Sequence, residues 1–120
     1  MDRDRINLSL RAEPPYGHVA QVATGSLCER LRWKRKAVND MRLAIDEATI
    51  MLLGPTPAKG RLNIEITTED RTVTITMRAT GQRTVVPTAR VDRFNKIVSP
   101  LVDSAKLDAK GHTVSLVRAG

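Results

Sequence analysis

Aromatic side chains are scarce in this chain, where Tyr16, Trp33 and Phe94 make up 2% of the residues. Nucleic-acid modules that stack bases on a surface need several exposed rings, so this class is disfavoured. Long apolar runs are missing as well: no stretch approaches the roughly 18 residues of a membrane span. The N-terminus lacks the apolar run of a secretory signal. We therefore expect a cytoplasmic protein with no membrane segment.

Metal-binding patterns are equally sparse. Cys28 is the single cysteine, which excludes an internal disulfide framework and a cysteine-based structural zinc site. The two histidines, His18 and His112, lie too far apart in the sequence to form a His-x-x-x-His pair. We expect no metal site, and we interpret Cys28 as a packed, inert thiol.

Positive charge is what the sequence has in excess. Twenty Lys and Arg residues against 13 Asp and Glu give a formal net charge of +7, which favours acidic partners. Hydrophobic residues make up 41% of the 120 residues. This hydrophobic fraction is enough for one core. The chain is too short for two domains of ordinary size. We expect a single domain over residues 1–120.

The spacing of apolar residues predicts seven elements of secondary structure. Alternating apolar and polar residues predict strands, the middle two forming a hairpin, and recurrence every three or four residues predicts helices. The expected strands cover 6–13, 61–68, 72–79 and 112–118, and the expected helices cover 18–33, 39–53 and 92–107. Asn39 is the expected N-cap of the second helix, and Pro100 is a blemish in the third. The order β-α-α-β-β-α-β predicts an α+β two-layer sandwich, a mostly antiparallel sheet with helices on one face.

One helical segment carries a family resemblance. Residues 41–49 read Met-Arg-Leu-Ala-Ile-Asp-Glu-Ala-Thr. They resemble the helix with the first ATP-binding motif of the anti-sigma factor serine kinases, which reads roughly Leu-Ala-x-x-Glu-Ala-x-x-Asn. That family belongs to the GHKL superfamily, with the Bergerat ATP-binding fold. The element order and the closing Gly111-His112-Thr113-Val114 are similar too, so the resemblance spans nearly the whole chain. It implies that Glu47 occupies the position of the family's general base.

The nucleotide-binding positions of this family are eroded here. Its magnesium-binding asparagine is replaced by Met51, whose soft thioether is a poor ligand for Mg²⁺. Its Asp-x-Gly-x-Gly motif is matched by Ala79, Gly81 and Arg83. Only Gly81 is retained, since Ala79 cannot bond the adenine amino group and the Cβ of Arg83 restricts close backbone approach. Residues 84–100 contain no glycine, although the family has a glycine-rich lid there.

These losses together predict that ATP and Mg²⁺ are not bound, because phosphoryl transfer depends on positioning the metal and the phosphates. We expect no cofactor. Glu47 is then a vestigial base, or simply a solvated or salt-bridged helix carboxylate. The positions Met51, Ala79, Gly81, Arg83 and Gly111 mark a degenerate nucleotide site, and the chain resembles a pseudokinase.

A basic run is the second feature of functional interest. It comprises Arg30, Arg32, Lys34, Arg35 and Lys36, with Trp33 among them. One interpretation is a solvated connection between helices, with Trp33 folded onto the sheet. The other is a docking surface for an acidic protein or a phosphate backbone.

The resemblance also bears on partners. It implies that sigma-factor contacts come largely from the first helix, where a family arginine would align near Gln21. Because that arginine is absent, the partner or its docking mode differs. We count Gln21 with the basic run and Trp33 as candidate partner-binding residues.

Three functions follow from these patterns. The first is a regulatory protein-binding module that sequesters a sigma factor or an anti-anti-sigma-type antagonist without phosphorylation. The second is an unconventional serine kinase or ATPase that uses Glu47. The third is a small basic nucleic-acid-binding protein. The resemblance further implies that family members pair through the sheet, and residues 6–13 could supply an edge strand for a homodimer.

Overall fold

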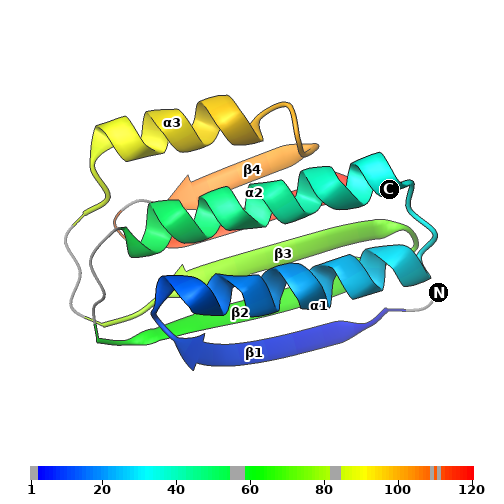
Figure 1. The fold of residues 1–120 in the computed structure, drawn as a ribbon, viewed down its shortest axis with the longest axis horizontal. Helices are drawn as coiled ribbons and strands as arrows, with labels where there is room; N and C mark the ends of the chain where they lie inside the picture. Colours follow the sequence, from blue (N-terminus) through cyan, green and yellow to red (C-terminus); the bar gives the residue numbers. More distant parts are fainter. Residues whose placement is uncertain (1–2, 55–58, 82–84, 109, 111) are drawn as a thin grey trace.

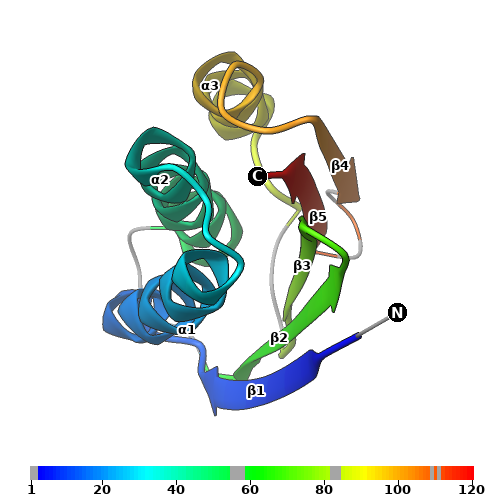
Figure 2. The same ribbon diagram turned by 90° about the vertical axis from the view of Figure 1, so that its right-hand side faces the viewer.

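The computed structural model describes residues 3–54, 59–81, 85–108, 110 and 112–120, and it confirms the α+β sandwich. Three helices lie on one side of a five-stranded sheet (Figures 1 and 2). Neighbouring strands are antiparallel throughout, in the order β1-β2-β3-β5-β4. The elements are β1 (Arg5–Arg11), the 3-10 helix η1 (Pro14–Tyr16), α1 (Gly17–Arg30), α2 (Arg35–Leu53), β2 (Arg61–Glu69), β3 (Thr72–Ala79), α3 (Thr88–Val98), β4 (Ser104–Asp108) and β5 (Thr113–Ala119).

The core lies between the sheet and the helices. Alternation places Leu62, Ile64 and Ile66 of β2 on the buried face, and Ile66 pairs with Ile75 of β3. The intervening residues of these strands face away from the helices and are mostly threonine or charged. α2 is the central helix, with 11 of its residues buried, which agrees with its long apolar periodicity.

The first two helices join through a short basic connection. α1 ends at Arg30, three residues before the predicted end. Arg32 adopts a left-handed conformation with φ 59°, which reverses the chain direction. α2 then begins at Arg35 rather than after Asn39, because Ala37 and Val38 already contribute buried side chains. The predicted N-cap at Asn39 is therefore wrong, and Lys34 occupies that position.

The predicted helix over 92–107 is also wrong in extent. α3 begins earlier, at Thr88, and ends at Val98. Ser104–Asp108 form the strand β4, which pairs with β5 along one side. Pro100 has no backbone N–H and cannot continue the helical bonding pattern. Ala105 and Leu107 pair with Leu116 and Val114 of β5, so tertiary pairing decides the conformation of this segment.

An ion pair ties the helix layer to the sheet. Arg118 Nη1 of β5 donates to Asp40 Oδ2 of α2 at 2.9 Å and also to the carbonyl of Leu101. Both charged side chains are largely buried. None of the helices in the described part of the chain is long and apolar enough to cross a membrane.

Candidate functional site

Glu47 lies on the buried side of α2 and is paired with an arginine from α3. Its residue is 8% exposed, and Arg93 Nη2 lies 3.4 Å from its Oε1. Arg93 is on the solvent side of this pair, with its side chain 61% exposed. The carboxylate that we expected to correspond to a general base is therefore a partner in an interhelical ion pair.

Two of the positions expected to mark a degenerate nucleotide site are packed, and so are two residues in and before α3. Met51 is 2% exposed and Ala79 is 4% exposed. Val86, which leads into α3, is 3% exposed, and Phe94 of α3 is 1% exposed. All four belong to one hydrophobic core cluster. These positions present thioether, methyl and ring surface, which suits core packing.

Gly81 has a structural reason to be glycine. It adopts φ +101°, and a Cβ there would lie against the carbonyl oxygen of Lys59. Gly60 faces it, and a Cβ on Gly60 would clash with the carbonyl oxygen of Thr80. The close approach of these two backbone segments explains Gly81 without a nucleotide. Arg83 and Gly111, the other two positions expected here, lie outside the described residues.

A second arginine of α3 packs on the C-terminal end of α2. The space that a Cβ on Gly54 would need is filled by the guanidinium of Arg90. Gly54 ends α2 with φ +67°, and its N–H bonds to the carbonyl of Ile50. A cation at a helix C-terminus is electrostatically favourable. Arg90 and Arg93 therefore hold α3 against α2 at two points, which single-sequence periodicity gave no means to foresee.

The basic run separates into exposed cations and a buried ring. Arg30, Arg32, Lys34, Arg35 and Lys36 are exposed at the end of the helix layer where α1 meets α2. Trp33 is 6% exposed, and its Nε1 donates to the carbonyl of Arg71 at 2.8 Å. The ring is thus part of the core, as the solvated-connection interpretation expects, and it anchors the connection beneath the cations.

Gln21 joins the two helices. It is half-buried, and its Nε2 donates to the carbonyl of Arg42 in α2 at 2.9 Å. Its Oε1 lies 3.2 Å from His18 Nδ1. The residue at the aligned arginine position therefore bonds within the chain.

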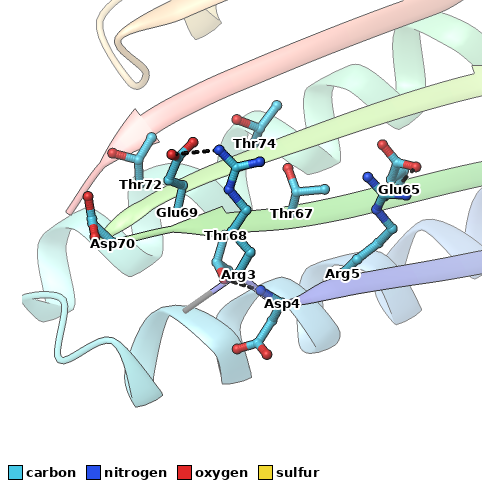
Figure 3. Close-up of a pocket in the computed structure, with 10 residues that line it drawn as sticks. All are labelled: Arg3, Asp4, Arg5, Glu65, Thr67, Thr68, Glu69, Asp70, Thr72 and Thr74. Carbon is cyan, nitrogen blue, oxygen red and sulfur yellow. Dashed lines mark hydrogen bonds and ion pairs between the residues drawn. The ribbon is translucent and has the colours of Figure 1, made fainter. Parts of the chain in front are cut away.

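Another hollow lies elsewhere on the molecule. It has a volume of about 670 Å³ and sits on the far face of the sheet, at the end of β2 and β3 (Figure 3). Arg3 bonds to Glu69 at 2.8 Å across it, and Arg5 lies 3.9 Å from Glu65. These four charged side chains are paired within the chain, and Asp4 and Asp70 also line the hollow. Among the described residues, no group of three or more His, Cys, Asp or Glu forms a potential metal site.

Comparison with known proteins supports the fold. The sequence matches no protein-family model, and no curated protein is significantly similar to it. The structure is similar to the crystal structure of the RsbU and RsbW domains of Rv1364c from Mycobacterium tuberculosis, with a TM-score of 0.64 and 14% sequence identity. The match covers 96% of this chain and 31% of that chain, so this chain spans about a third of its length. This likeness shows a shared α+β fold over one part of that chain.

Proposed function

We propose that this chain is a regulatory protein-binding module of the anti-sigma type, acting in the cytoplasm. It would sequester a sigma factor or an anti-anti-sigma-type antagonist without ATP-dependent phosphorylation. At a coarse level the RsbW-like fold fits such a role. The side chains around Glu47 support the absence of phosphorylation.

The observation that carries the proposal is the Glu47–Arg93 ion pair. A general base must be free to accept a proton from a hydroxyl within hydrogen-bond reach. Among the described residues, the charged partner shown for Glu47 is Arg93, whose guanidinium competes with such a hydroxyl for Oε1. The ion pair therefore supports a structural role for the carboxylate of Glu47 on this RsbW-like fold.

The residues described around Glu47 do not fit Mg·ATP. Met51 would place a thioether where Mg²⁺ needs a hard oxygen, and it is 2% exposed within the core cluster. The side chain of Ala79 has no polar atom to accept a hydrogen bond from an adenine amino group. Arg93 stands beside the carboxylate. We therefore derive no phosphoryl-transfer step.

Sequestration would be steric. The five exposed cations at the α1–α2 end form a positive surface, and a partner with acidic side chains would be attracted and oriented by it. Trp33 and its bond to Arg71 hold the connection that carries these cations. A partner bound there would be unable to use the covered surface for another contact.

The proposal is tested by binding measurements with purified sigma factors and antagonist-type proteins of the same host, with and without Mg·ATP. We expect one of them to bind with the same affinity under both conditions. Micromolar binding of Mg·ATP to the chain, or transfer of labelled γ-phosphate that is lost in Glu47→Gln, would instead establish the kinase alternative.

Nucleic-acid binding is the second candidate, favoured by the same exposed cations. It requires affinity for duplex or single-stranded probes that falls steeply with salt. Charge reversal at Lys34, Arg35 and Lys36 should abolish that affinity. Binding that survives the reversal would remove this candidate.

A further inference from the structure

The outer surface of the α1–α2 layer combines exposed apolar residues with the basic end. α1 and α2 pack side by side, as the bond from Gln21 to the carbonyl of Arg42 shows (Figure 1). Four of the five large apolar side chains that the structure describes as exposed lie on these two helices, on the side away from the core. They are Val19 (40%), Val22 (49%), Leu43 (46%) and Ile50 (41%), and we call them the apolar stripe. The basic end is Arg30, Arg32, Lys34, Arg35 and Lys36.

The stripe and the basic end are in line. Lys36, Leu43 and Ile50 are seven residues apart along α2, so they share one face of the helix. With a rise of 1.5 Å per residue, Leu43 lies about 10 Å and Ile50 about 21 Å from Lys36 along the axis. Val19 and Val22 widen the stripe on α1. A hollow of about 470 Å³ lies beside the cations and is lined in part by Glu29, Arg35 and Arg42.

We propose that this face docks an acidic amphipathic helix of the partner protein. Two apolar residues of that helix, seven positions apart, would cover Leu43 and Ile50. Acidic residues a further seven positions along would meet the cations of Lys34, Arg35 and Lys36. The inference rests on the proposed function and names the chemistry of the partner segment. Apolar anchors beside a charged rim are the ordinary anatomy of a protein interface.

Other occupants fit the same face less well. Asp46 is exposed between Leu43 and Ile50, so an anionic lipid surface would meet a negative charge in the middle of the stripe. A second copy of the chain would bring a second set of cations, against Glu29 and Asp46 as the exposed acidic residues of these two helices. A nucleic-acid backbone would leave the apolar stripe uncovered.

The test uses the full chain and a synthetic helical peptide. The peptide carries Leu at two positions seven apart and three Glu one spacing further on. Its control carries Ser in place of both Leu. We expect only the Leu peptide to bind in a calorimetric titration, with amide shifts in the NMR spectrum confined to α1 and α2.

Two variants of the chain separate the two halves of the surface. Leu43→Gln with Ile50→Gln removes the anchors and should weaken binding at least about tenfold. Lys34→Glu, Arg35→Glu and Lys36→Glu together should weaken binding and reduce its salt dependence. Glutamates at the start of α2 are compatible with the helix dipole. Because Lys36→Glu also removes the ion pair with Asp40, circular dichroism and thermal unfolding check that this variant folds. The matched control reverses Lys96, Lys106 and Lys110, which are exposed outside this face, and should bind as the wild type does.

Several outcomes would overturn the inference. Peptide binding unchanged by Leu43→Gln with Ile50→Gln would do so, and so would no binding at all. Phosphatidylglycerol vesicles that bind the wild type and not this variant would assign the face to lipid. A dimer in sedimentation that this variant dissociates would assign it to a second copy. A sigma factor that binds wild type and variants equally would overturn this inference and leave the proposed function standing. Binding of the peptide, without binding of any sigma factor or antagonist, would support this inference and overturn the proposed function.

Discussion

Arg93 Nη2 lies 3.4 Å from Glu47 Oε1, and this ion pair joins α3 to the C-terminal half of α2. The same two helices meet again where Arg90 packs on Gly54. Phe94 and Val98 bury the apolar side of α3. α3 is thus held against α2 by contacts within the protein.

The strength of the Glu47–Arg93 pair can be measured with a double-mutant cycle. We expect Glu47→Gln, Arg93→Gln and the double variant to give a coupling free energy of about 0.5–1 kcal/mol in urea unfolding, since Arg93 is mostly exposed. Salt should reduce this coupling.

The exposed Lys96 of α3, whose charge removal should have little effect, is the matched control. A coupling of zero at low salt would show that Arg93 and Glu47 do not interact in solution. Arg93→Gln should also fail to gain affinity for Mg·ATP, because Met51 and Ala79 remain.

A substitution at Gly81 can test whether this glycine is needed for the backbone packing described above. Gly81→Ala places a Cβ at φ +101° against the carbonyl oxygen of Lys59. We expect the free energy of unfolding to fall by about 1–3 kcal/mol. Gly25→Ala, at a helical glycine whose Cβ would lie 3.4 Å from the flexible side chain of Arg42, should cost less or be neutral. Equal stability of both variants would contradict the close approach.

The interactions of Asp40 should make the free energy of unfolding depend on pH. Hydrogen bonds from Lys36 and from Arg118 hold the pKa of Asp40 below its ordinary value, although burial opposes them. A lowered pKa in the folded state stabilises the protein above the ordinary value of about 3.9. This contribution should be lost as the pH falls through the lowered pKa. We expect Asp40→Asn to be less stable at pH 7 by about 2 kcal/mol and to lose less stability on acidification.

The two partners of Asp40 should differ in energetic weight. The Lys36 side chain is 83% exposed, whereas that of Arg118 is 19% exposed. We expect Lys36→Ala to cost at most about 0.5 kcal/mol and Arg118→Met to cost several times more. Chemical denaturation at pH 7 measures both, and the reverse ranking would refute the weight assigned to Arg118.

Trp33 is the only tryptophan and should report on the folded core. Because it is 6% exposed, we expect its fluorescence to have a blue-shifted emission maximum and to be quenched poorly by iodide. On unfolding, the emission maximum should shift to longer wavelength. Trp33→Phe removes the bond to the carbonyl of Arg71 and should cost about 1–3 kcal/mol. Efficient iodide quenching of the folded protein would place the ring on the surface instead.

Cys28 should be chemically silent in the folded state. Burial is the main cause that raises its pKa to about 12, and the residue is 0% exposed. At pH 8 almost no thiolate is present, so a disulfide exchange reagent should react only at the rate of unfolding. Fast reaction in native buffer, matching that in denaturant, would contradict this burial.

Much of the fold could be predicted from local pattern. The alternation of Leu62, Ile64 and Ile66 identified β2, and the apolar periodicity from Met41 to Leu52 identified α2, because burial of one face imposes a period that the sequence must carry. β4 could not be predicted in this way. Its residues are mostly exposed, and its conformation depends on pairing with β5.

In the candidate site too, some features follow from the sequence and others only from the tertiary structure. The sequence by itself determined that Met51 and Ala79 lack the donor atoms for Mg·ATP, since that is a property of the residue types. It also showed an excess of cations between the first two helices. Only the tertiary structure decided that Arg93 pairs with Glu47 and that Trp33 is buried beneath the cations. It alone also decided that Val22, Leu43 and Ile50 face outward on one side. Each of these relationships joins residues from separate elements, and their distances are set by how helices and sheet pack.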